Sequence, residues 1–326
     1  MARYRFHSRI VSFFCVLVVF ILLSPASAAE YPQKDKAIQL MVHWSAGGSS
    51  DTGARLMASG MEKEIGTSVL VVNKPGAGGQ IGYTALSQAK PDGYTIGSTN
   101  FPSAISSYLD PGRKATYNRQ SFELLALHVV DPGIIAVKAD SPYKTLQDVI
   151  NAAKAAPKKL RVNTTGIQTD EHFATLWLEQ LTGAQLARVH LKGSAPSVTA
   201  VLGGKIEVYC GNVGDPQVRG SEFRVLGVLD YERSPFFPNV KTFEEQGYKI
   251  YFGSSRGFAA PAGTPKEIVN ILSKAMGNVT KTEDHKQKML NMGLTLRYMD
   301  PAGYKKYWDE FEAKLRELMP LIHKES

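Results

Sequence analysis

The sequence predicts an α/β fold of parallel strands joined by crossover helices. Short apolar segments of strand length alternate along most of the chain with longer segments in which apolar residues recur every three to four positions. The 43% hydrophobic and 10% aromatic content supports buried cores and excludes a disordered chain. At roughly 100–200 residues per domain, the 326 residues suggest two domains. Ligands of such folds bind beyond the carboxyl ends of the strands.

The expected elements follow in chain order from these patterns. A strand at 38–44 precedes a helix at 51–65, in which Met57 and Met61 share one side. Thr264 is expected to cap a later helix, with Pro265 in its first position. Further strands are expected at 69–72, 95–98, 134–137, 160–163, 187–190, 206–210 and 225–229. Further helices are expected at 80–88, 146–155, 170–181, 195–202, 265–278 and 301–319.

The first 28 residues have the layout of a secretory signal peptide. Arg3, Arg5 and Arg9 precede an apolar run at 10–23, and small residues lead to an Ala-x-Ala site that ends at Ala28. A membrane anchor is the alternative, but a spanning helix needs about 20 apolar residues and this run is shorter. We therefore expect export to the periplasm with cleavage after about Ala28.

Charge and cysteine content then exclude several function classes. The 38 Lys and Arg against 30 Asp and Glu give +8, and removal of the three leader arginines leaves +5. This modest charge on an exported protein argues against nucleic acid as a partner. Cys15 lies in the leader, so Cys210 stays without a disulfide partner and is expected to be a small buried hydrophobe. No metal-ligand spacing occurs among the seven histidines, so no metal or cofactor is expected.

Catalytic motifs are weak in this sequence. The glycine-rich run at 76–82 fails the dinucleotide fingerprint, because Ile81 stands where the third glycine is required. The run at 253–257 matches G-x-S-x-G around Ser255. A nucleophile elbow needs a helix directly after the serine, and the next expected helix begins only at 265. An exported hydrolase that uses Ser255 is kept as an alternative, and no enzymatic activity is expected.

Three strand-to-helix loops are candidates for binding an anion. They lie at 45–51, 164–169 and 192–196 and are rich in Gly, Ser and Thr. Glycines let backbone N–H groups approach a ligand, and the dipole of the following helix favours negative charge. Each loop can also do no more than cap its helix. Together the loops predict a carboxylate or phosphate site built without formal positive charge.

Several segments in order resemble the periplasmic solute-binding proteins of tripartite tricarboxylate transporters, often called Bug proteins. The first is Gly47-Gly48-x-x-Asp51-x-x-Ala54-Arg55, and a more specific one runs from Val71 to Gly82 and continues at 90–95. Later matching segments are Lys192 to Pro196, Leu202 to Lys205, Arg233 to Pro235 with Pro238, Val240, Thr242, Glu244 and Gly247, and Ala260 to Pro265. In order and spacing they cover nearly all of the chain after the leader.

The resemblance implies a type II periplasmic binding protein fold, with two α/β domains and a ligand cleft between them. Because no linker separates two halves, crossover strands are expected at the boundary, with one domain at 29–130 plus 252–326 and the other at 131–251. The family's ligand contacts correspond to Ser45, Gly48, Ser49, Thr99 and Asn100 in the first domain and to Thr165, Thr169, Gly193, Ser194 and Asp215 in the second. Arg256 is expected to make either a bidentate carboxylate contact or a surface ion pair.

The same resemblance implies the function. The protein would capture a small carboxylate, either a di- or tricarboxylate or an aromatic carboxylate, as its cleft closes. It would deliver this ligand to the membrane permease subunits of a tripartite tricarboxylate transporter, and it is expected to be a monomer. A ligand-dependent sensor partner would use the same cleft and is a further alternative. Departures from the family pattern, among them Trp44 and Gln168, bear on which carboxylate is bound.

Overall fold

The structure is a computed structural model that describes residues 31–44, 46–191, 194–215 and 220–323. The predicted leader at 1–28 and the predicted ligand residues Ser45 and Gly193 lie outside the described residues. From Lys34 onward the described residues form one compact unit, which contains all the described helices and strands.

A ten-stranded sheet runs through the described part of the chain, in the order β2-β1-β3-β9-β4-β7-β5-β6, with β8 and β10 also paired to β4. Its strands are β1 (Ile38–Val42), β2 (Val69–Asn73), β3 (Thr95–Phe101), β4 (Phe122–Lys138), β5 (Arg161–Thr164), β6 (Ala187–His190), β7 (Val208–Asn212), β8 (Phe223–Leu229), β9 (Gly253–Pro261) and β10 (Leu296–Met299). The parallel pairing that the sequence predicts is confirmed within β2-β1-β3 and within β7-β5-β6. It is wrong for the predicted strands at 134–137 in β4 and 225–229 in β8, which pair antiparallel. Strand β9, which the sequence does not predict, is also antiparallel to its neighbours.

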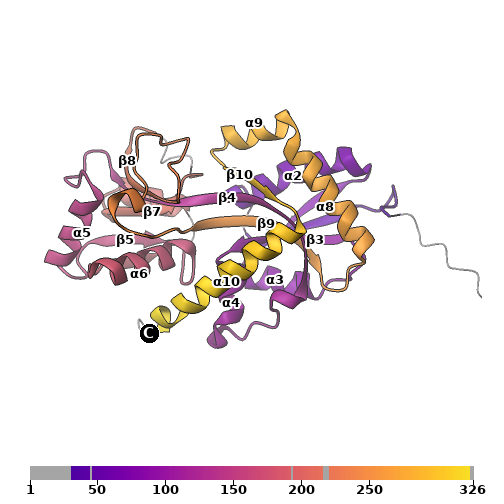
Figure 1. The fold of residues 1–326 in the computed structure, drawn as a ribbon, viewed down its shortest axis with the longest axis horizontal. Coiled ribbons are helices and arrows are strands. Elements are labelled where there is room, and N and C mark those ends of the chain that lie inside the picture. Colours follow the sequence, from indigo (N-terminus) through magenta and orange to yellow (C-terminus); the bar gives the residue numbers. More distant parts are fainter. Residues whose placement is uncertain (1–30, 45, 192–193, 216–219, 324–326) are drawn as a thin grey trace, which may run out of the picture. The chain divides into compact units, whose positions relative to one another are not determined.

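Strand β4 joins the two parallel groups. Its first part pairs with β9 and β10, and its second part pairs with β7 and β8. Figure 1 shows β4 and β9 running side by side through the centre of the unit. The sequence predicts only 134–137 of this strand, because the buried polar residues His128 and Asp131 and the imino acid Pro132 interrupt its apolar pattern.

The helices cover the sheet as crossover connections. They are α2 (Ser49–Ile65), α3 (Gln80–Ser87), α4 (Ser103–Leu109), α5 (Leu146–Ala155), α6 (Asp170–Thr182), α7 (Ser194–Leu202), α8 (Lys266–Lys281), α9 (Glu283–Asn291) and α10 (Pro301–His323). One hydrophobic cluster contains both Phe101 of β3 and Phe173 of α6. Helix α10 contacts α4 and α6 and buries Tyr304 and Trp308 completely. The core is therefore continuous across the two parallel groups.

Two helix ends differ from the sequence prediction. Pro265, in an extended conformation, is the N-cap of α8, whereas the Thr264 hydroxyl donates to the carbonyl of Pro261 at 2.7 Å. The predicted cap at Thr264 is therefore wrong. Helix α10 continues through Pro320 to His323, because Leu318, Met319 and Ile322 keep the last turns packed on the core.

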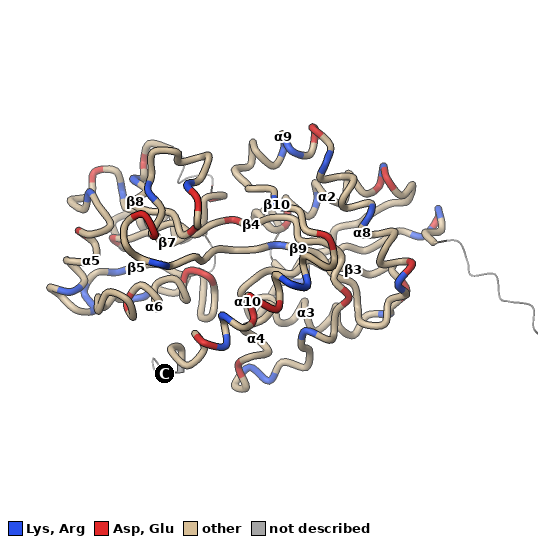
Figure 2. The backbone as a smooth tube through the Cα atoms, viewed as in Figure 1, with Lys and Arg blue, Asp and Glu red and all other residues tan. Residues whose placement is uncertain are grey.

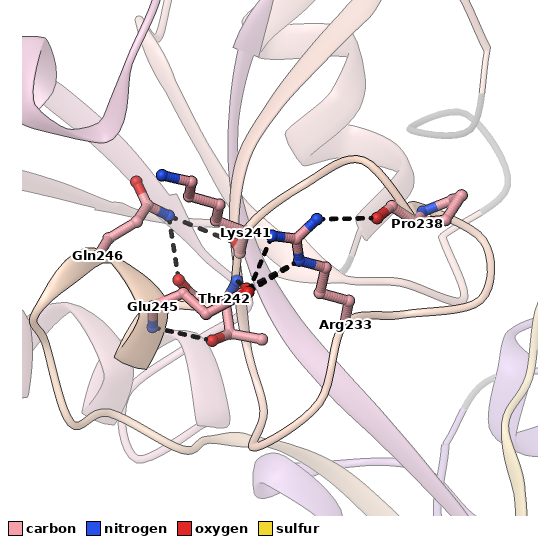
Figure 3. A network of polar contacts seen from close by, with 6 residues as sticks. All are labelled: Arg233, Pro238, Lys241, Thr242, Glu245 and Gln246. Carbon is pink, nitrogen blue, oxygen red and sulfur yellow. Dashed lines mark hydrogen bonds and ion pairs between the residues drawn. The ribbon is translucent and has the colours of Figure 1, made fainter.

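The segment after β8 is held by the network in Figure 3. The Arg233 guanidinium binds both carboxylate oxygens of Glu245 and donates to the carbonyl of Pro238. Glu245 also accepts from the backbone N–H of Thr242 at 2.7 Å, and its own N–H donates to the Thr242 hydroxyl at 3.1 Å. The hydrogen bonds from Arg233 lower the pKa of Glu245 to about 2. Arg233 and Thr242, which belong to the segments that resemble the family, thus stabilise the surface segment after β8.

Candidate functional site

A cavity of about 130 Å³ lies where loops and helix N-termini from both parallel strand groups meet. It is found at the carboxyl ends of β3, β5 and β7, the position at which open α/β sheets bind ligands. We call it the central cavity. Its walls are formed by Trp44, Ser49, Ser50, Asn100, Phe101, Pro102, Ser103, Thr165, Thr169, Asp170, Glu171, Ser194, Asn212, Asp215 and Ser254.

The first wall of the central cavity is the N-terminus of α2. Gly48 is the N-cap residue and has no side chain with which to cap the helix. The first N–H groups of a helix have no intrahelical acceptor, and together they carry partial positive charge that favours an anion. Ser49 and Ser50 add hydroxyl groups at the same place, and Asn100 lies beside them at the end of β3. This wall is suited to a carboxylate.

Asp51, in the first turn of α2, stabilises the loop that leads into this wall. Its carboxylate accepts from the N–H of Gly47 and from Arg55 Nε, both at 2.9 Å, and from Asn73 Nδ2 at 2.8 Å. Burial alone would raise the pKa of Asp51, but these three hydrogen bonds outweigh it and hold the pKa below its ordinary value. The negative charge of Asp51 is therefore compensated by partners of its own.

The second wall is acidic. Asp170 Oδ2 accepts from Asn212 Nδ2 at 2.8 Å, and Glu171 Oε2 accepts from the Thr165 hydroxyl at 2.7 Å. Asp215 Oδ2 accepts from the Tyr209 hydroxyl at 2.7 Å and from the N–H of Asn212 at 2.9 Å. Burial raises the pKa of Asp170 and Glu171, and the proximity of the two carboxyls raises that of Asp170 further. Among the residues that the structure describes, the hydrogen bonds that hold these acids come from neutral donors.

A buried ion pair lies outside the central cavity. Arg256 of β9 donates through Nη2 to Asp131 Oδ2 of β4 at 3.0 Å, and Asp131 Oδ1 accepts from the N–H of Gly214 at 2.8 Å. Burial raises the pKa of Asp131 to about 6, against the lowering effect of Arg256. Both side chains are buried, so the surface ion pair expected for Arg256 is wrong, and Arg256 does not line the central cavity.

A wider groove of about 1110 Å³ shares Ser49, Thr165 and other residues with the central cavity. Contacts span this region between the segment at 106–113 and the loop at 167–168. Arg113 donates through Nη2 to the carbonyl of Ile167 at 3.1 Å, Ser106 donates to the carbonyl of Gln168 at 3.3 Å, and the Gln168 amide donates to Asp110. These bonds join the α4 end of the first parallel group to the loop before α6.

The model of the tripartite tricarboxylate transporter family receptor, TctC, matches residues 53–324 of the chain. The chain therefore belongs to the tripartite tricarboxylate transporter receptor family.

Several known proteins resemble this chain in sequence and in fold. The UPF0065 protein of the gbd 5′ region of Cupriavidus necator is 31% identical over 304 residues, or 90% of this chain and 89% of the relative. Protein BugT of Bordetella pertussis is 30% identical over 280 residues, or 82% of this chain and 84% of BugT. The solved structure of the periplasmic binding protein BugD is 26% identical with a TM-score of 0.78, covering 89% of this chain and 99% of BugD. The solved structure of MatC from Rhodopseudomonas palustris with bound malate is 24% identical and has a TM-score of 0.78. The match covers 88% of this chain and 99% of MatC, which shares the fold.

These relatives confirm the predicted family and the predicted periplasmic binding protein fold. The structure brings together six of the ten ligand residues that the sequence predicts for the receptor: Ser49, Asn100, Thr165, Thr169, Ser194 and Asp215. Gly48 lines the wider groove. Thr99 is buried beneath the site, where its hydroxyl bonds that of Tyr304, and it does not line the central cavity. The domain boundaries at 130 and 252 stay predictions.

Other residues in the receptor's cavity wall were not predicted. Ser50, Ser103, Asn212 and Ser254 supply further polar groups, and Asp170 and Glu171 supply charge. A signal for the acids was present in the sequence, because they are the first two residues of the helix expected after the loop at 164–169. Thr169 precedes them as N-cap, so both carboxyls lie in the first turn of α6.

The structure does not support the hydrolase alternative for this receptor. Ser255 lies inside β9, between residues that pair with β3 and β4, and no helix follows it directly. Its hydroxyl bonds the Tyr307 hydroxyl at 2.5 Å and is not in an exposed elbow. Cys210 is buried, as expected, and burial raises the pKa of its thiol.

The described residues contain neither a metal-ligand cluster nor a membrane-spanning helix. None of their His, Cys, Asp and Glu side chains form a group of three or more that could hold a metal ion. Among the same residues, no helix has both the length and the apolar character needed to cross a membrane.

Proposed function

We propose that this receptor-family protein captures a small carboxylate in the central cavity. The observation that carries the proposal is the N-terminus of α2, which has no side-chain cap and opens on the cavity beside Ser49, Ser50 and Asn100. A carboxylate bound there would accept from backbone N–H groups and hydroxyls in a place where the helix dipole favours negative charge. MatC, a protein of the same fold, has malate bound, which supports a small carboxylate as the class of ligand.

Ligand capture would proceed by cleft closure. We take the domains as 29–130 plus 252–326 and 131–251, so that β4 and the segment just before β9 connect them. The bonds from Arg113 to Ile167 and from Ser106 to Gln168 would then join the two domains across the wider groove. A ligand that contacts both walls stabilises the form in which these bonds exist, and it shifts the population toward that form.

The captured carboxylate would be delivered in the periplasm to the permease subunits of a tripartite tricarboxylate transporter. The family to which the chain belongs supports this role, and we propose that export uses a leader cleaved after about Ala28. Lys and Arg are interspersed with Asp and Glu along most elements (Figure 2), which supports a ligand site made by loops and helix ends instead of a large basic surface. N-terminal sequencing of the periplasmic protein tests the cleavage position.

The decisive experiment is direct identification of the ligand. The protein is purified from the periplasm, denatured, and the released small molecules are identified by mass spectrometry. After refolding without ligand, calorimetry is performed with malate, succinate, citrate, adipate and benzoate. We expect a carboxylate among the released molecules, and binding of at least one carboxylate with a rise in Tm. No released carboxylate, together with no binding and no rise in Tm, would reject the proposed function.

A further inference from the structure

A second cavity, of about 600 Å³, lies on the opposite face of β9 from the central cavity. Ser254 lines the central cavity and the next residue, Ser255, lines this second cavity, because side chains alternate between the two faces of a strand. The other walls come from α6, α10, β4, β10, the end of β8 and the segment before β9. We call it the α10 pocket. None of the described residues lines both this pocket and the central cavity or the wider groove.

The walls of the α10 pocket are largely aromatic. Tyr231 and Tyr251 stack with their ring centroids 3.9 Å apart and their planes at 14°. Tyr231 is nevertheless 68% exposed, the largest exposed fraction among the large hydrophobic residues that the structure describes. Trp177, Phe252 and Phe311 form a second aromatic wall, with centroids 6.4 and 5.7 Å apart in turn. Since ligand pockets of about 300–1,000 Å³ are lined mainly by such side chains, these walls suit a small planar ring.

The α10 pocket also contains cations that have no partner of their own. Lys249 and Arg297 line it, and neither makes a hydrogen bond or an ion pair with the residues that the structure describes. The third cation, Lys314, has its ammonium group 4.0 Å from the centroid of the Trp177 ring and 3.9 Å from Glu317 Oε2. Lys249 and Arg297 therefore keep all their side-chain donors for an anionic ligand.

Two acids line the same pocket and oppose these cations in part. Glu310 Oε1 lies 3.9 Å from Nζ of Lys306, which is not among the described lining residues. Asp230 accepts from the N–H of Tyr231 at 2.8 Å. Burial raises the pKa of the Asp230 carboxyl, and the charge of Arg297 lowers it without an ion pair between the two. Among the described lining residues, three cations thus face two acids, and the balance favours an anion.

We propose that the α10 pocket is a second binding site, which takes a small aromatic carboxylate. The ring of this ligand stacks on Tyr231, and its carboxylate accepts from Arg297, whose planar guanidinium matches the two oxygens of a carboxylate. Lys249 adds a second positive charge to the site. The inference goes beyond the proposed function, because it concerns the face of β9 that points away from the central cavity.

The three tryptophans of the chain report which site a ligand occupies. Trp44 lines the central cavity, Trp177 lines the α10 pocket, and Trp308 is completely buried. The refolded ligand-free protein is labelled with 5-fluorotryptophan, and its fluorine NMR resonances are assigned with the variants Trp44→Phe and Trp177→Phe. Benzoate and phenylacetate are then titrated in. We expect the Trp177 resonance to shift and to saturate with a dissociation constant of about 1 mM or less.

Matched ligands separate the contribution of the charge from that of the ring. Benzamide lacks the negative charge of benzoate, and cyclohexanecarboxylate keeps the charge but lacks the aromatic ring. Each is expected to bind at the Trp177 site at least about threefold more weakly than benzoate. A Trp177 resonance that stays in place at about 10 mM benzoate and phenylacetate overturns the inference, and so does equal or tighter binding of either comparison ligand. A shift of the Trp44 resonance alone supports the proposed function and overturns this inference.

Variants separate direct binding in the α10 pocket from an indirect shift caused by a ligand elsewhere. Arg297→Gln removes the guanidinium charge, and Tyr231→Ser removes the exposed ring; both side chains lie at the surface, so folding should be kept, which circular dichroism checks. Each is expected to weaken benzoate binding at the Trp177 site about fivefold or more. The control Arg316→Gln changes an arginine that is 62% exposed and is not among the described lining residues, and it should leave the affinity unchanged. Unchanged affinity in both pocket variants overturns the inference.

Discussion

Asn100 Nδ2 lies 2.7 Å from Ser50 Oγ, and this hydrogen bond joins the end of β3 to the first turn of α2. Both residues line the central cavity. Since the Ser50 oxygen accepts from the amide, its own O–H can donate to a bound carboxylate, and the amide fixes the side chain in that direction. The anion end of the site is therefore positioned by a contact between two elements 50 residues apart in sequence.

Removal of this contact should weaken ligand binding. Asn100→Ala is expected to lower carboxylate affinity about tenfold, or about 1.4 kcal/mol, because one hydrogen bond to the anion loses its support. Calorimetry measures the change, with circular dichroism to check folding. Asn278→Ala is the matched control, because Asn278 donates to Glu64 on the surface away from the cavity. Unchanged affinity in Asn100→Ala would contradict the role given to the α2 wall.

Arg113 should control how long the ligand stays bound. Arg113→Gln removes its donations to the carbonyls of Ile167 and Ala77, at 3.1 and 3.3 Å. Loss of contacts across the groove destabilises the closed form, so we expect ligand dissociation to accelerate about three- to tenfold. This change in rate corresponds to a loss of about 0.7–1.4 kcal/mol in the stability of the closed form. Stopped-flow fluorescence measures the dissociation rate. The control Arg316→Gln removes the pair that Arg316, 62% exposed, makes with Glu312 within α10, and it should leave the rate as it is. Equal rates in all three proteins would refute the prediction.

Stability of the ligand-free protein should change with pH through Asp170. Burial raises the pKa of this carboxyl in the folded state, so the folded protein holds the proton more strongly than the unfolded chain. The resulting stabilisation is complete below the ordinary pKa of 3.8 and is lost as pH rises through the raised folded value.

Asp170→Asn should remove that pH-dependent loss. The variant is expected to be as stable as the natural protein at pH 4 but more stable at pH 8, by roughly 1 kcal/mol or about 2 °C in Tm. Calorimetric scans at both pH values test it. Asp140→Asn serves as control, since hydrogen bonding to Lys138 lowers the pKa of that exposed carboxyl. A lower Tm for Asp170→Asn at pH 8 would be inconsistent with burial as the dominant effect.

The Cys210 thiol should be unreactive in the folded protein. Burial raises its pKa, and the side chain is 1% exposed in β7, so the reactive thiolate is scarce and shielded. A thiol-specific chromogenic reagent at pH 8 is expected to label less than a tenth of the folded protein lacking residues 1–28 and all of it in guanidinium chloride. Rapid labelling without denaturant would show that β7 opens locally.

The sequence reveals most of the scaffold because its parallel strands are short, apolar and bounded by Gly, Pro or Ser. The helix at 146–155 and the strand at 187–190 are found with their predicted limits. Strand β4 is largely missed, since its polar residues His128 and Asp131 are buried by partners that come from distant segments. Strand β9 is also missed, since its first half is made of Gly, Ser and Arg and is stabilised by pairing on both sides.

The residues of the candidate site also fall into those that local sequence predicts and those that depend on distant partners. Loop residues such as Ser49 and Thr169 could be predicted, because Gly- and Ser-rich loops before helices have a local signature. Thr99 could not be separated from Asn100, because neighbouring residues on a strand face opposite ways and the side that faces the cavity depends on tertiary packing. The acids Asp170 and Glu171 resemble ordinary first-turn helix residues in sequence, and only the fold shows that they line a cavity.

The continuity of β4 restricts how this scaffold can change over evolutionary time. Ile135 and Val137 belong to one hydrophobic cluster, and Ile134 and Ala136 belong to another on the opposite face. A single inserted or deleted residue near Pro132 would exchange the two sets and disrupt both clusters. Changes of chain length that alter ligand choice are therefore confined to the loops around the cavity, while β4 can accept only substitutions.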